Sequence, residues 1–77
     1  MKQIEVLGPG CAKCKRLEKN VNEAVASLGL KAEVIKVDDI GEIMDRGVMM
    51  TPAVVVDGNI LTEGKVPSPE ELMKLLK

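Results

Sequence analysis

Two cysteines, Cys11 and Cys14, are the residues whose type and spacing best suit chemistry in this 77-residue chain. They stand in the segment GPGCAKC, with two residues between them. A Cys-x-x-Cys pair can cycle between a dithiol and a disulfide, because this spacing keeps both sulfur atoms on one helical turn. The same pair can bind a soft metal ion through two thiolates. The spacing alone leaves both kinds of site open.

A metal site is limited by the ligands that the sequence offers. Structural zinc needs four ligands, and the chain has two cysteines and no histidine, so we expect no zinc site. Copper(I) remains an alternative, because two soft thiolates can hold it. Small copper chaperones are similar in length and also place a Cys-x-x-Cys after their first strand. They usually have methionine two residues before the first cysteine, where this chain has Pro9, and they end in a strand.

Composition argues against two classes of partner. The chain has no aromatic residue for base stacking and a net charge of −1, so we expect no nucleic-acid partner. No apolar run approaches the roughly 20 residues of a membrane span. The N-terminal segment MKQIEVLGPG lacks the pattern of a signal peptide. We therefore expect a cytoplasmic protein, in which a cysteine pair is more often catalytic or metal-binding than structural.

Apolar, β-branched segments predict four strands: Lys2–Leu7, Lys31–Val37, Ala53–Val56 and a run from Ile60 onward. The first two strands are expected to be parallel, since a helix connects them. The last two are expected to be antiparallel, because Asp57-Gly58 predicts a tight hairpin turn between them.

The first predicted helix presents the cysteines. Its apolar stripe consists of Cys14, Leu17, Val21, Ala24 and Leu28, and Gly29 stops it. Cys14 should therefore face the core, while Cys11 should lie at the N-terminal rim of the helix. The helix start favours a thiolate on Cys11. Lys13, with Lys15 and Arg16, adds positive charge there, although a solvated helix face explains these cations equally well.

Two further helices have recognisable ends. Asp39 is the expected cap of a short helix that ends at Gly47, with one apolar face made of Ile40, Ile43 and Met44. Ser68 is the expected cap of the last helix, with Pro69 in its first position. The order β-α-β-α-β-β-α predicts one α/β domain over residues 1–77, with a four-stranded mixed sheet and helices on both faces.

The segment CAKC, followed much later by TPAVVVDG, resembles the thioredoxin-fold superfamily. The whole chain resembles the small bacterial and archaeal thioredoxin-like proteins called redox-active disulfide proteins. This resemblance implies a minimal thioredoxin fold and a thiol–disulfide oxidoreductase that reduces protein disulfides. Cys11 would be the nucleophile and Cys14 the resolving thiol. It also implies a monomer without a resident cofactor, with a flavoprotein disulfide reductase as electron donor.

The resemblance implies roles for four further residues. Thr51 and Pro52 would form a cis pair facing the cysteines and would bind an extended substrate backbone; a trans proline opening a strand is the alternative. Gly64 matches a family glycine near the site. Glu5 stands six residues before Cys11, where thioredoxins have a buried acid that can take the proton of the resolving cysteine; a solvent-facing glutamate is the alternative.

The sequence also departs from its larger relatives. Gly10 stands where thioredoxins have tryptophan, so an apolar lip around the site would come from Met49, Met50 and Pro9, although the methionines equally suit packing. The glutaredoxin pattern that holds glutathione is absent around Glu63-Gly64, which makes glutathione dependence doubtful. A copper(I) carrier and a redox sensor remain the alternative functions.

Overall fold

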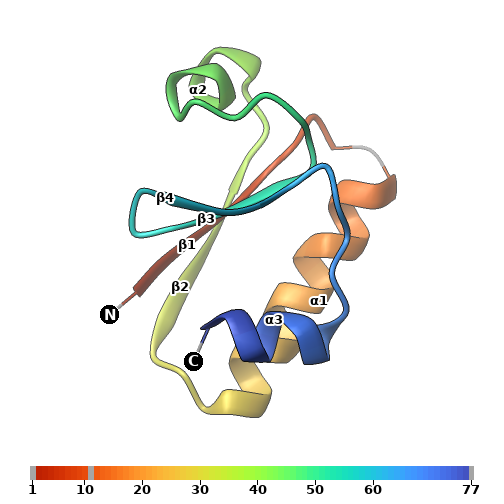
Figure 1. The fold of residues 1–77 in the computed structure, drawn as a ribbon, viewed down its shortest axis with the longest axis vertical. Coiled ribbons are helices and arrows are strands. Elements are labelled where there is room, and N and C mark those ends of the chain that lie inside the picture. The colour runs from red at the N-terminus through yellow and green to blue at the C-terminus, as the bar shows by residue number, and fades with distance from the viewer. Residues whose placement is uncertain (1, 11, 77) are drawn as a thin grey trace.

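Strand β1, Lys2–Leu7, lies inside a mixed sheet. The computed structural model describes residues 2–10 and 12–76, and within them four strands form the order β2-β1-β3-β4 (Figure 1). β2, Ala32–Val37, is parallel to β1, and β3, Ala53–Val56, is antiparallel to it. β4, Asn59–Glu63, is antiparallel to β3. The predicted mixed sheet is confirmed, with β2 beginning one residue later and β4 one residue earlier than expected.

The turn between β3 and β4 has the predicted hairpin geometry. Asp57 and Gly58 have φ angles of 50° and 85°, and two positive φ angles suit the twist of a tight hairpin. The turn is also bonded to β1. Gln3 N–H donates to Asp57 Oδ1 at 2.9 Å, and Asp57 N–H donates to the carbonyl oxygen of Gln3 at 2.9 Å.

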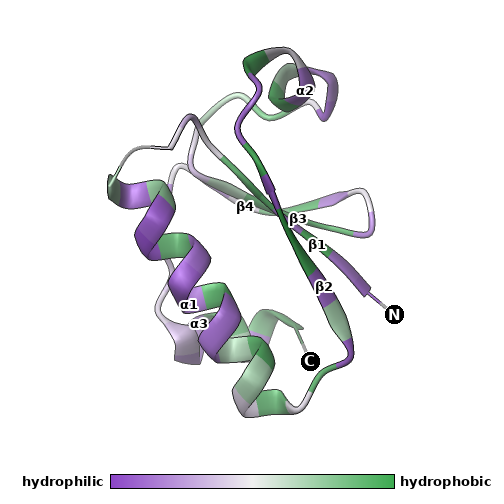
Figure 2. Ribbon diagram, turned by 180° about the vertical axis from the view of Figure 1, so that it is seen from behind, coloured by the Kyte–Doolittle hydropathy of each residue, from purple (hydrophilic) through white to green (hydrophobic). Residues whose placement is uncertain are grey.

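Helices cover both faces of the sheet, as predicted. α1, Ala12–Leu28, and α3, Pro69–Leu76, lie on one face, and α2, Ile40–Asp45, lies on the other (Figure 1). Figure 2 shows hydrophilic bands along α1 and hydrophobic stretches along the strands beside it. The buried core beneath α1 and α3 consists of Ile4, Val6, Leu17, Val21, Ala24, Val54, Leu72 and Leu76. The smaller core on the α2 side consists of Leu7, Val37, Ile43, Val48, Ala53 and Val55.

Four of the five residues in the predicted stripe of α1 are buried, and the fifth, Leu28, is half-buried. Its fully buried positions are Cys14, Leu17, Val21 and Ala24. The helix ends at Leu28, and Gly29 follows with a φ of 60°, a conformation in which glycine costs little. The N–H of Leu30 then donates back to the carbonyl oxygen of Val25 at 3.1 Å.

The short helix α2 differs from its predicted packing. Asp39 caps it as expected, with Oδ1 accepting from Glu42 N–H at 3.1 Å. The predicted apolar face is wrong, because Ile40 and Met44 are 66% and 69% exposed and only Ile43 of the three is buried. A helix of six residues makes fewer than two turns, so it meets the sheet through one side chain rather than through a stripe.

No helix within residues 2–10 and 12–76 is both long and apolar enough to cross a bilayer.

Candidate active site

Cys14 lies in the first turn of α1, packed against the end of β1. Only 3% of its surface is exposed. Its neighbour is Gly8, the first residue after β1: a Cβ added at Gly8 would overlap the Sγ of Cys14 and would lie 3.1 Å from its Cβ. The same added atom would be 3.9 Å from the Cα of Pro52. Gly8 therefore lies between the Cys14 thiol and Pro52, and its missing side chain lets the three approach.

Cys11, which precedes Ala12 in the chain, lies outside the residues that the structure describes, so its predicted exposure stays a prediction.

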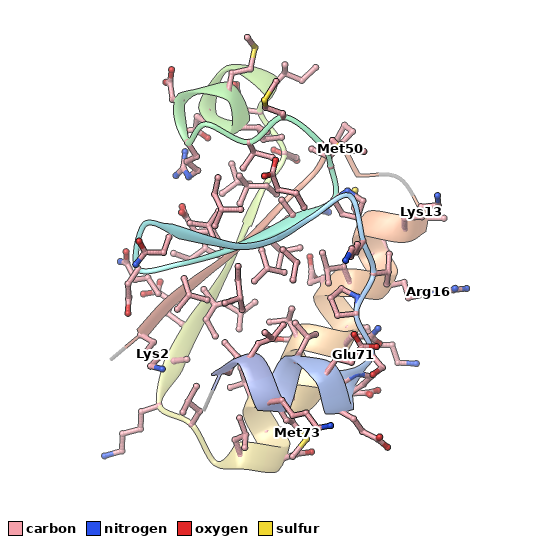
Figure 3. The ribbon with its side chains drawn as sticks, in the orientation of Figure 1. Lys2, Lys13, Arg16, Met50, Glu71 and Met73 are labelled. Atoms are coloured by element: carbon pink, nitrogen blue, oxygen red, sulfur yellow. The ribbon has the colours of Figure 1, made fainter. Side chains whose placement is uncertain are left out.

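The surroundings of the start of α1 are positively charged. The first turn of α1 has no acidic residue. Lys13 and Arg16 are exposed and point away from the sheet (Figure 3). In the described part of the chain neither forms an ion pair. Cations at a helix start are unfavourable for the helix but favour a nearby thiolate.

The peptide bond between Thr51 and Pro52 is cis, which confirms the prediction made from the family resemblance. Pro52 is buried and Thr51 is exposed. The carbonyl oxygen of Pro52 accepts a hydrogen bond from Gly64 N–H at 2.9 Å. Among the described residues, none bonds to the backbone N–H or C=O of Thr51. These two groups are therefore available to an extended chain that lies alongside.

Gly64 and Glu63, at the end of β4, hold the segment that precedes Pro52. The Oε2 atom of Glu63 accepts from the N–H of Met49 at 2.8 Å and from the N–H of Met50 at 3.3 Å. Gly64 has a φ of 66°, and a Cβ there would lie 3.1 Å from the Cε of Met50. The segment before the cis proline is thus tied to β4 through both backbone and side-chain contacts.

Met49 and Met50 are not core fillers. They are 91% and 62% exposed, respectively. Figure 3 places Met50 at the same end of the molecule as Lys13, beyond the end of the sheet. An exposed methionine is flexible and polarizable, and so adapts to apolar partners of different shape. This exposure agrees with the predicted apolar lip and disagrees with the alternative of buried packing.

The structure does not bring Glu5 to Cys14. The Glu5 carboxylate accepts from Arg46 Nε at 2.9 Å and from Arg46 Nη2 at 2.6 Å, and its side chain is 17% exposed. Glu5 alternates with Ile4 and Val6 along β1, so it lies on the α2 side of the sheet, opposite α1. The partly buried ion pair matches neither the acid expected beneath Cys14 nor the solvent-facing alternative. Its hydrogen bonds raise the pKa of Arg46.

Metal ligands do not gather in the described part of the chain. Within residues 2–10 and 12–76, no three His, Cys, Asp or Glu side chains are grouped so that they could hold an ion. Cys11, the second thiol that the copper(I) alternative requires, is outside this range.

Comparison of the whole chain with known proteins identifies its family. A sequence model of the thioredoxin domain matches residues 2–77. A thioredoxin of Methanothermobacter thermautotrophicus is 42% identical over 76 residues, which cover 99% of each chain. A thioredoxin of Methanocaldococcus jannaschii is 46% identical over 74 residues, covering 96% of this chain and 85% of the relative. The chain belongs to the thioredoxin family.

Family membership fixes the class of reaction: the chain is a thiol–disulfide oxidoreductase. Solved structures share the fold at much lower identity. A thioredoxin-2, described as a component of the malaria parasite protein secretion machinery, superimposes with a TM-score of 0.76 at 16% identity, covering 99% of this chain and 81% of that one. Another malarial protein gives 0.75 at 14% identity, covering 99% of this chain and 93% of that one. The predicted thioredoxin fold is confirmed.

Two residues of this thioredoxin-family site escaped the sequence analysis. Gly8 had a visible signal, because a glycine directly after a strand and before the cysteines marks a close approach of backbone. Glu63 had none, since nothing in its local sequence indicates that its carboxylate binds backbone groups thirteen and fourteen residues earlier.

Proposed function

We propose that this chain reduces disulfide bonds of proteins, with Cys11 as nucleophile and Cys14 as resolving thiol. The observation that carries the proposal is the packing of the Cys14 thiol against Gly8, next to the cis Thr51–Pro52 bond. A buried thiol suits the second step of the reaction, because it reacts only with a partner delivered by its neighbour in the motif. Thr51 is exposed, and its backbone N–H and C=O are not bonded to other described residues, which suits the binding of an extended substrate.

The reaction balances over two exchanges. The Cys11 thiolate attacks one sulfur of the substrate disulfide, and the other substrate sulfur leaves as a thiolate that takes up a proton. The Cys14 thiol then loses its proton to solvent and attacks the sulfur of Cys11. The second substrate sulfur leaves, so the substrate has gained two electrons and two protons while the chain holds a Cys11–Cys14 disulfide. A flavoprotein disulfide reductase is the proposed donor that returns the two electrons.

The remaining residues bind the substrate rather than react. The N–H and C=O of Thr51 would pair with the substrate backbone as one short β ladder, next to the buried ring of Pro52. Gly64 offers no side chain, so a substrate backbone can pass close to it. Lys13 supports the thiolate of Cys11 through its charge. Met49 and Met50 supply apolar contacts at the rim.

The redox chemistry of the cysteine pair also supports a proposal for where the protein works. We propose that residues 1–77 work as one thioredoxin-like domain, as a monomer in the cytoplasm. A reducing compartment keeps structural disulfides open, which leaves a Cys-x-x-Cys pair available for catalysis. The net charge of −1 and the lack of aromatic residues support protein rather than nucleic acid as the substrate.

Single-cysteine variants test the assignment. Reduction of insulin disulfides by the chain, supplied with dithiothreitol, is expected to fall to the uncatalysed rate in Cys11→Ser. In Cys14→Ser the first exchange still occurs, so a mixed disulfide with the substrate should accumulate and be visible by mass spectrometry under non-reducing conditions. Ser27→Ala, near the far end of α1, serves as the control. Full activity of Cys11→Ser would overturn the proposal.

A further inference from the structure

We infer that Glu63 is a positioning residue for substrate binding, acting through the backbone of Met49 and Met50 on the Thr51–Pro52 pair. The inference rests on the proposed function and deepens it. Glu63 is the last residue of β4 and does not touch the reacting sulfurs in any step described above. Its carboxylate holds the segment that presents the Thr51 backbone to the substrate.

Hydrogen bonds from Glu63 and Gly64, at the end of β4, restrain the chain before and after Thr51. Before Thr51, the Oε2 atom of Glu63 accepts from the N–H groups of Met49 and Met50, at 2.8 Å and 3.3 Å. After it, Gly64 N–H donates to the carbonyl oxygen of Pro52 at 2.9 Å. Thr51 itself keeps its backbone groups unbonded within the described residues. The hydrogen bonds of Glu63 and Gly64 therefore fix the position of Thr51 and leave its backbone N–H and C=O available for a substrate.

The charge of Glu63 matters for this role. A carboxylate that accepts from backbone N–H groups makes shorter and stronger hydrogen bonds than a neutral acceptor. In the described part of the chain the ion pair formed is Arg46–Glu5, so Glu63 has its carboxylate committed to backbone donors rather than to a cation. Without these bonds, the segment before Pro52 would have to be ordered by the substrate itself, and this ordering would weaken binding.

The side-chain packing of Met50 alone does not replace the carboxylate. Met50 contacts Gly64 through its side chain but is 62% exposed, and Met49 is 91% exposed. Side chains this exposed bury little apolar surface, so they contribute little to holding the backbone in place. The hydrogen bonds of Glu63 are thus the main restraint on the N-terminal side of Thr51.

The test compares two substrates that differ in their need for Thr51. Insulin has a backbone that can pair with Thr51, whereas 5,5′-dithiobis(2-nitrobenzoate) is a small disulfide without one. In Glu63→Gln and Glu63→Ala the KM for insulin should rise, by about fivefold to tenfold in the alanine variant and less in the glutamine variant, as expected for loss of charge-assisted hydrogen bonds. The kcat with insulin and the rate with the small disulfide should change less than about twofold.

The control variant is Glu33→Gln, on the exposed part of the edge strand β2, which removes the same charge far from the segment. Equal loss of rate with both substrates, or an unchanged KM for insulin, would overturn the inference. Glu63→Gln keeps the size of the side chain and carries the test if the alanine variant does not fold.

A second measurement separates this inference from the proposed function. Amide hydrogen exchange at Met49 and Met50 should become faster in Glu63→Gln than in the parent chain, whether or not the protein reduces insulin. An inactive parent chain would refute the proposed function, and unchanged exchange at these two amides would refute the positioning role.

Discussion

At the scale of single residues, Gly8 is required by close packing and not by a special backbone angle. The glycines at turns in this chain have positive φ angles, whereas Gly8 is identified by its contact with the Cys14 thiol. Its N–H also donates to the carbonyl oxygen of Val37 at 2.9 Å, which anchors the end of β1 to β2. The backbone here cannot shift to make room without breaking that bond.

Gly8→Ala is therefore expected to destabilise the fold. The added methyl group would overlap the Sγ of Cys14, and overpacking in a closely packed site costs about 1–3 kcal/mol. Equilibrium urea unfolding followed by far-ultraviolet circular dichroism measures the change. Gly41→Ala in α2 is the matched control, since alanine is favoured over glycine in a helix and its Cβ, at 3.1 Å from the Oδ1 of Asp39, requires only a small shift of an exposed side chain. Equal stability of Gly8→Ala and the parent chain would show that the site can relax.

Sequence patterns identified the residues that obey a local period or belong to a family motif. Cys14 is buried because it continues the stripe that includes Leu17. Thr51 and Pro52 were found through the motif, since sequence alone favours a trans bond. Glu5 was assigned by its spacing from Cys11, but its strand direction places it on the other face, with Arg46. Its partner follows α2, forty-one residues away, and no local pattern encodes such a contact.

At the scale of elements, the ends of the helices are better specified than their packing. Both predicted caps are formed: Asp39 accepts from Glu42 N–H, and the Oγ of Ser68 accepts from Glu71 N–H at 3.2 Å. Caps depend on residues three positions apart, so local sequence determines them. Which side chains of α2 are exposed depends on how this short helix packs over the sheet, and local sequence does not determine that packing.

Ser68→Ala should weaken the docking of α3. This helix buries Leu72 and Leu76 in the larger core, so fraying at its start disturbs the packing beneath it. Loss of a serine cap costs about 1 kcal/mol, which lowers Tm by roughly 4–8 °C in a domain of this size. Thermal unfolding followed by circular dichroism checks this. Ser27→Ala, an exposed position near the end of α1, should leave Tm nearly unchanged, and a similar Tm for both variants would contradict the capping role.

At the scale of the whole molecule, charge is unevenly distributed. Residues 12–19 contain four cations and one carboxylate, so this segment has a charge of +3 and the rest of the sequence −4. The cations are Lys13, Lys15, Arg16 and Lys19, all exposed along the half of α1 nearest the cysteines. A field of this kind steers oppositely charged partners toward the site and is screened by salt.

Disulfide peptides with acidic flanking residues should therefore react faster than peptides with basic ones at low ionic strength. Stopped-flow rate constants for the two peptides should converge between about 10 mM and about 500 mM salt, because the Debye length shortens from about 30 Å to only a few Å. Lys15→Glu should reduce the ratio of the two rate constants, whereas Lys31→Glu, in the connection between α1 and β2, should not. A ratio independent of salt would show that the charge does not steer partners.

The strand order leaves β2 and β4 as the two outer strands, and unpaired outer strands are where sheets stick to other chains. Each of these outer strands has a feature that opposes pairing with another chain. Glu33 and Lys36 place exposed charges along β2, and an irregularity between Val54 and Val55 interrupts the ladder that β4 forms with β3. Charges on one outer strand and an interrupted ladder at the other oppose the addition of a further strand, so the sheet is expected to resist edge-to-edge aggregation.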